Sequence, residues 1–111
     1  MDRLTNYKSL VKQIVCSLAK DVPYIEGVRT ELVIDDEKGH YELLEVGWMD
    51  TRRVHGLVIH CDIMNDKIYV EHDGTSEGIV DMLLEKGVPH QDIVVGFHAP
   101  EMRKYTPFAQ V

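Results

Sequence analysis

The first twenty residues carry apolar side chains at every third or fourth position. The stripe runs through Leu4, Tyr7, Val11, Ile14 and Leu18, and is widened by Leu10 and Val15. This spacing predicts an amphipathic helix of about five turns. Its outer side is polar and partly basic, and Pro23 is expected to end the segment.

The next fifty residues alternate apolar and polar positions, which is typical of β-strands. We expect four strands, over residues 28–34, 40–48, 54–63 and 67–72. Polar turns separate the first three strands, at residues 35–39 and 50–52. Asn65-Asp66 suits a two-residue hairpin between the last two, because both residues tolerate positive φ.

The last two strands can be aligned through that hairpin. Pairing Met64 with Lys67 places Cys61 opposite Val70 and Ile59 opposite His72. One face is then apolar and is predicted to be the core face, with Leu57, Ile59, Cys61, Ile63, Ile68 and Val70. The other face is polar with one aromatic residue, and carries Val58, His60, Asp62, Tyr69, Glu71 and Asp73.

A second helix is expected after the fourth strand, with Thr75 or Ser76 capping its first turn. Gly87 and Pro89 are expected to end it. Residues 91–96 fit either a fifth strand or a short helix. The remaining C-terminal tail is expected to be extended, with Tyr105 and Phe108 against the body.

These elements predict a single α+β domain over residues 1–111, in two layers. Its sheet is a four-stranded antiparallel meander, with one helix before it and the other after strand four. If both helices cover the same sheet face, the opposite face is open in a monomer. Trp48 or Tyr69 on the open face would invite a partner, and self-association through that face is one option.

The composition is that of an ordinary globular protein, with 44% hydrophobic and 28% charged residues. No segment is apolar enough to span a membrane, and the N-terminus lacks a signal-peptide pattern, so we expect a cytoplasmic protein. The net charge of −7 opposes direct nucleic-acid binding, although the first helix is basic. An acidic body suits solubility or docking on a basic partner.

Six histidines raise the question of a metal site. The hairpin alignment puts His60, Asp62 and Glu71 on one face, with His60 opposite Glu71, and these are nitrogen and oxygen ligands of the kind that zinc accepts. An ordinary cross-strand pair accounts for the same residues, and no HxxxH spacing is present. We therefore expect no metal and no cofactor. Cys16 and Cys61 are expected to be buried free thiols.

No Walker loop, GxSxG, HExxH or GxGxxG motif occurs, so we do not expect an enzyme. A contact surface for a partner is expected on the polar hairpin face, at His60, Asp62, Tyr69 and Glu71. Arg52 and Arg53 could form bidentate pairs with carboxylates, although a solvated turn fits equally well. His98, in a loop, is a further contact candidate.

Six stretches of the sequence together resemble the XisI-like family, the fdxN-element excision controlling factors of cyanobacteria. They are residues 40–48 (HYELLEVGW), 52–63 (RRVHGLVIHCDI), 67–75 (KIYVEHDGT), 87–89 (GVP), 92–98 (DIVVGFH) and 103–109 (RKYTPFA). The resemblance runs nearly end to end. Tyr69, Glu71 and Ser76 stand where the family commonly has Trp, Gln and Glu.

The resemblance implies the family's fold and a role in controlling site-specific excision of a DNA element during heterocyst development. It also implies a protein partner, an XisH-like protein with a nuclease fold, while a separate recombinase cuts and rejoins the DNA. The family brings no catalytic residues to transfer. We expect a regulatory binding module; the alternatives are a direct DNA-binding excision accessory and a metal-dependent hydrolase using His60, Asp62 and Glu71.

Overall fold

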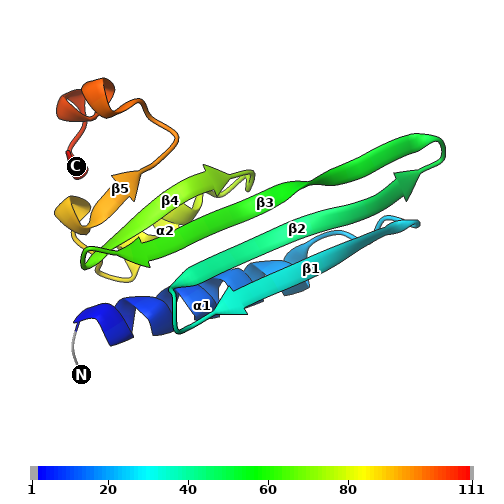
Figure 1. Ribbon diagram of the computed structural model, residues 1–111, viewed down its shortest axis with the longest axis horizontal. Coiled ribbons are helices and arrows are strands. Elements are labelled where there is room, and N and C mark those ends of the chain that lie inside the picture. Colours follow the sequence, from blue (N-terminus) through cyan, green and yellow to red (C-terminus); the bar gives the residue numbers. More distant parts are fainter. Residues whose placement is uncertain (1–2, 111) are drawn as a thin grey trace.

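The computed structural model describes residues 3–110; residues 1–2 and 111, the ends of the expected domain, lie outside the described residues. Helix α1 (Arg3–Asp21) precedes four strands and helix α2. The strands are β1 (Val28–Asp35), β2 (His40–Met49), β3 (Arg52–Met64) and β4 (Lys67–Asp73), followed by α2 (Ile79–Glu85) (Figure 1). A short strand, β5 (Ile93–Val95), lies between the 3₁₀ helices η1 (His90–Asp92) and η2 (Pro100–Tyr105).

The sheet has five strands in the order β1-β2-β3-β4-β5, which corrects the expected four-stranded meander. The first four strands are antiparallel neighbours, as predicted, but β5 pairs with β4 in parallel. The chain crosses over through α2 between these two strands, and such a crossover returns it in the same direction. An apolar run of three residues is too short for periodicity to distinguish strand from helix.

Both helices lie on the same face of the sheet, as predicted (Figure 1). The stripe of α1 and the inner residues of α2 pack in one cluster with the inward side chains of the strands. Its fully buried members include Val11, Val15, Tyr41, Leu43, Ile59, Cys61, Ile68, Val70, Ile79, Leu83 and Ile93. Among the described residues, no helix is both long enough and apolar enough to cross a membrane.

Helix α2 begins later than predicted, at Ile79, and Thr75 Oγ1 accepts a hydrogen bond from the N–H of Gly78, the residue before the helix, at 3.0 Å. Gly78 precedes the helix with φ 87°, a conformation that glycine adopts without strain. The Asp73 carboxylate, at the end of β4, accepts a hydrogen bond from the Ile79 N–H at 2.7 Å and others from Thr75 at 2.9 and 2.6 Å. A strand-end aspartate therefore holds the helix start.

Two β-bulges correct the predicted faces. Leu43 pairs with Ile59 but Leu44 pairs with Leu57, so Val58 is the extra residue in β3. The bulge turns Leu57 off the core face, where it is 38% exposed. In the next pairing Cys61 is opposite Val70, as predicted. His60 then pairs with His72 instead of Glu71, because Glu71 is the extra residue in β4.

The C-terminal tail is not extended, because residues 100–105 form η2. Phe108 packs against the core as expected, but Tyr105 is 73% exposed. Ala109 donates its N–H to the Ile93 carbonyl at 3.0 Å, so the tail runs along the free edge of β5.

Candidate functional site

The sheet face opposite the helices carries alternate side chains of the antiparallel strands. We call it the open face. Strand alternation and the pairings assign to it Arg29, Glu31, Val33, Asp35, His40, Glu42, Leu44, Val46, Trp48, Arg53, His55, Leu57, His60, Asp62 and Tyr69. No described helix covers these residues (Figure 1). Most of the candidate contact residues predicted from the sequence lie here.

One end of the open face holds a histidine–carboxylate cluster made of His40, Glu42, His60 and Asp62. The Asp62 Oδ1 atom lies 2.6 Å from His40 Nδ1 and 3.0 Å from His60 Nε2. His60 Nε2 also lies 3.4 Å from Glu42 Oε1. The hydrogen bond to Asp62 raises the pKa of His40 above its usual 6.5. Two imidazoles therefore share one carboxylate, which is only 9% exposed.

The structure brings together two of the three predicted metal ligands, His60 and Asp62, with Tyr69 opposite Asp62 on β4. Glu71 lies elsewhere: a Cβ atom on Gly96 would come within 2.0 Å of Glu71 Oε1, so this side chain lies against the chain after β5. Within residues 3–110, no group of three or more His, Cys, Asp or Glu side chains is arranged to hold a metal ion.

His40 and Glu42 belong to the cluster but are absent from the predicted site. The sequence did contain a pattern from which these two residues could have been found. Aligning residues 40–48 with residues 54–63 through the intervening turn brings His40 opposite Asp62 and Glu42 opposite His60 when one extra residue is allowed. The Val58 bulge supplies that residue, and alternation alone does not reveal a bulge.

The other end of the open face is apolar and basic. Trp48 at this end is 52% exposed, and Leu57 in the middle of the face is 38% exposed. The guanidinium of Arg53 lies over the Trp48 ring, 5.2 Å from its centroid, in a cation–π contact. The sequence analysis considered Trp48 as a residue of the open face, and the structure places it there.

Arg52 and His98, the two remaining predicted contact residues, do not belong to the open face. Arg52 donates to the Met49 sulfur at 3.4 Å, on the opposite side of the hairpin from Arg53. His98 is exposed in the loop after β5, with its ring edge-on to Phe97 at 5.1 Å. The predicted set is thus divided among three places.

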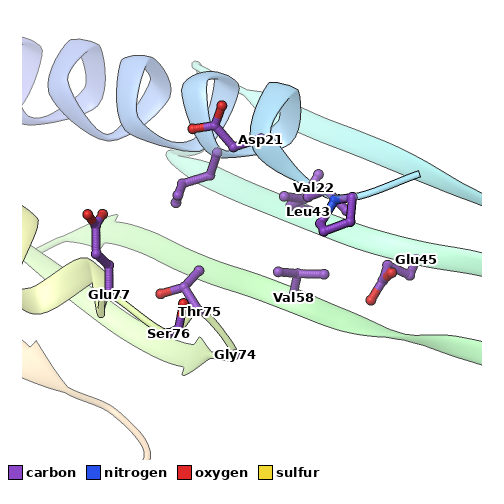
Figure 2. A pocket seen from close by; sticks show the side chains of 11 residues that line it. Asp21, Val22, Leu43, Glu45, Val58, Gly74, Thr75, Ser76 and Glu77 are labelled. Carbon is purple, nitrogen blue, oxygen red and sulfur yellow. The ribbon is translucent and has the colours of Figure 1, made fainter. Parts of the chain in front are cut away.

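A groove of about 470 Å³ lies on the helix side, between the end of α1, the sheet and residues 74–77 (Figure 2). Its walls are apolar at Leu18, Val22, Leu43 and Val58. Carboxylates stand around it, at Asp21, Glu45 and Glu77, and no basic residue lines it. The sequence pattern did not point to this groove, because its walls come from four separate segments.

The sequence as a whole shows to which protein family the chain is related. The sequence profile of the family described as XisI protein matches residues 1–110. The chain belongs to the XisI family.

Solved structures of XisI relatives agree with this assignment. An XisI-like protein from Anabaena variabilis is 35% identical, with a TM-score of 0.93 over 97% of this chain and 99% of that one. The fdxN element excision controlling factor XisI from the same organism is 34% identical, with a TM-score of 0.88 over 99% of this chain and 100% of that one. No curated protein matches the chain significantly. The XisI fold thus includes the helix-covered sheet described above.

Proposed function

We propose that this XisI family member is a cytoplasmic, non-enzymatic regulatory protein that acts with an XisH-like partner in the control of site-specific DNA excision. The observation that carries the proposal is the full-length similarity to a protein named as an fdxN element excision controlling factor, at 34% identity. The similarity covers 99% of this chain and 100% of that one, so it is not confined to one part of the fold.

The side chains favour binding over catalysis. Both imidazoles of the histidine–carboxylate cluster, those of His40 and His60, are already engaged by the Asp62 carboxylate, at 2.6 and 3.0 Å. Three large apolar side chains are exposed on the same face: Val33 next to Glu42, Leu57 in the middle and Trp48 at the far end. An exposed apolar strip with polar borders is typical of a protein contact surface.

Charge favours a basic partner. The chain carries a net charge of −7, and the helix-side groove is bordered by Asp21, Glu45 and Glu77. An acidic protein can cover the basic surface through which a nuclease-fold partner would hold DNA. In this proposal the XisI protein restrains or directs its partner by occupying that surface.

The test is co-expression with the XisH-like protein encoded in the same genome, followed by size-exclusion chromatography with light scattering. We expect one peak containing both proteins at about 0.15 M salt, weakening as the salt concentration rises. Two separate peaks at low salt, with both proteins folded, would contradict the proposal. The double variant Asp21→Lys/Glu77→Lys then distinguishes whether the acidic groove takes part.

The direct DNA-binding alternative loses its main support. It depended on the basic side of the first helix, but Lys12 is ion-paired with Asp36 at 2.8 Å and Lys8 donates to the Glu37 carbonyl at 3.2 Å. Both lysines are thereby engaged by the β1–β2 turn. The metal-dependent hydrolase alternative loses its ligand set, because Glu71 lies apart from His60 and Asp62.

A further inference from the structure

A second groove adjoins the acidic groove on the helix side of the sheet. It has a volume of about 330 Å³ and lies between α1 and α2. Leu18, Asp21 and Glu77 line both grooves, so the two form one continuous depression, which we call the interhelix groove. It follows α1 from Leu10 to Asp21, a length of about 17 Å at 1.5 Å per residue.

The floor and walls of the interhelix groove are apolar because the helix layer is incomplete. Helix α2 has only 7 residues, against 19 in α1, so the two helices leave part of the sheet between them uncovered. Five half-buried apolar side chains pack on the core from one side and line the groove with the other: Leu10, Leu18, Val22, Val58 and Met82. Sheet surface of this kind is normally covered by a helix or another chain segment.

The rim of the interhelix groove is acidic. Asp21, at the end of α1, and Glu77, before α2, stand on opposite sides of it (Figure 2), with Glu45 and Glu85 toward its two ends. Within residues 3–110, none of these four carboxylates forms an ion pair with a basic side chain. Lys86 is the one basic residue of that range that lines the groove. An apolar floor is thus bordered by negative charge that the described residues do not neutralise.

We propose that the interhelix groove holds a segment of the partner protein that carries apolar side chains flanked by lysine or arginine. The apolar side chains pack on the floor of the groove, and the cations pair with the carboxylates of Asp21 and Glu77. This inference rests on the proposed function, because the partner named there supplies the segment.

Charge selects this occupant over a second copy of the chain. A second copy also carries a net charge of −7, which opposes its approach to an acidic rim. Two lysines of its α1, Lys8 and Lys12, are moreover engaged by the β1–β2 turn. The C-terminal tail of the chain itself is bound along β5, where Ala109 donates to the Ile93 carbonyl. The segment therefore comes from a protein of opposite charge.

The first test fills the groove without changing its charge. Ser17 and Ser76 are exposed and line the groove, so Ser17→Trp and Ser76→Trp each place an indole where the segment lies. Each should raise the dissociation constant of the complex with the XisH-like protein of the same genome at least about 10-fold, measured by isothermal titration calorimetry. Ser9→Trp is the matched control, because Ser9 is an exposed serine of the same helix and does not line the groove. It should leave the constant unchanged.

The second test reverses the charge of the rim. Asp21→Lys/Glu77→Lys should raise the dissociation constant at least about 30-fold at low salt, because two attractions become repulsions. Glu26→Lys/Glu101→Lys makes the same change in net charge at exposed positions outside the groove and should have a much smaller effect. Circular dichroism checks that every variant is folded.

A photo-crosslinking residue identifies the occupant. In the complex, p-benzoylphenylalanine at position 13, on the rim of the groove, should join to a partner segment that contains lysine or arginine beside apolar residues. Absence of a complex between the unmodified proteins would overturn both the proposed function and this inference. A complex that forms but ignores the Ser17, Ser76 and charge variants would overturn this inference alone. Crosslinking to a segment without basic residues, or to a second copy of the chain, would do the same.

Discussion

Tyr7 and Asp92 connect the two ends of the chain through side chains alone. The Tyr7 hydroxyl donates a hydrogen bond to Asp92 Oδ2, and Arg3 Nε lies 3.8 Å from the same oxygen. Burial and the neighbouring carboxylate raise the pKa of Tyr7 to about 12, so the hydroxyl stays protonated and can donate. Asp92 is only 8% exposed, so it depends on this donor.

Tyr7→Phe should therefore lower the free energy of unfolding by about 1–3 kcal/mol, because it leaves a buried carboxylate without its hydroxyl donor. Urea denaturation followed by circular dichroism measures the loss. Tyr24→Phe is the matched control, since Tyr24 is 85% exposed, and it should change the free energy little. Equal effects of both substitutions would show that the Tyr7–Asp92 bond adds no stability.

His40 should make stability dependent on pH. Its pKa is raised by the hydrogen bond to Asp62, with Asp35 and Glu42 adding to the shift. A histidine whose pKa is raised by folding stabilises the protein fully below 6.5, and that contribution is lost as the pH rises through the raised pKa. The contribution is less than about 1 kcal/mol, because His40 is half exposed.

Two measurements check this prediction. NMR titration should show His40 titrating above 6.5. The free energy of unfolding should fall by more between about pH 6 and pH 8 in the natural protein than in His40→Gln. A His40 that titrates at or below its usual value would contradict the role assigned to Asp62.

Single residues were predictable wherever strand alternation was unbroken. Asp62 and Tyr69 lie on one face because the predicted hairpin register holds from residue 61 to residue 70, and His60 shares that face by alternation within β3. Beyond that point Glu71 was misplaced, because a bulge depends on how both strands twist and pack, and the residues of one strand do not encode it alone.

At the scale of elements, two glycines control where β1 meets β2. A Cβ atom on Gly47 would lie 2.0 Å from the Gly27 carbonyl oxygen and 2.8 Å from Val28 Cα. The start of β1 therefore approaches the end of β2 more closely than any side chain permits. This contact lies close to the β2–β3 turn, two residues before β2 ends at Met49.

Gly47→Ala should lower the free energy of unfolding by about 1–3 kcal/mol, because backbone atoms must move to admit the methyl group. Gly56→Ala is the control in the adjacent strand, since a Cβ there meets nothing within 4 Å. That substitution should be neutral or slightly stabilising. Thermal and urea denaturation of the two variants measure the difference, and a neutral Gly47→Ala would show that the strands can separate without cost.

The elements themselves followed from the pattern. The first helix and four strands were placed within a few residues, because their periodicities extend over six residues or more. Strand β5 and the start of α2 were not resolved, because the parallel pairing to β4 and the Asp73 hydrogen bonds come from tertiary contacts. The histidine–carboxylate cluster required the pairing of β2 with β3 for the same reason.

At the scale of the whole molecule, the negative net charge should oppose binding to nucleic acid. The net charge is −7, and two of the three lysines of α1, Lys12 and Lys8, are engaged by Asp36 and by the Glu37 carbonyl. We expect no gel shift of non-specific duplex DNA at about 10 µM protein and 0.1 M salt. A shift that weakens steeply as salt rises would contradict this prediction and revive the DNA-binding alternative.

The helix that covers the sheet has a further consequence for synthesis. Helix α1 is synthesised before the strands on which it packs. The hydrogen-bond partner of its Tyr7, Asp92, follows 85 residues later in the sequence. About fifty residues must follow α1 before β4 is complete, which takes roughly 3–10 s at ribosomal rates of about 5–20 residues per second. During that interval the apolar face of this amphipathic helix has no complete sheet to pack on. We therefore expect chaperones that hold hydrophobic segments to bind the growing polypeptide.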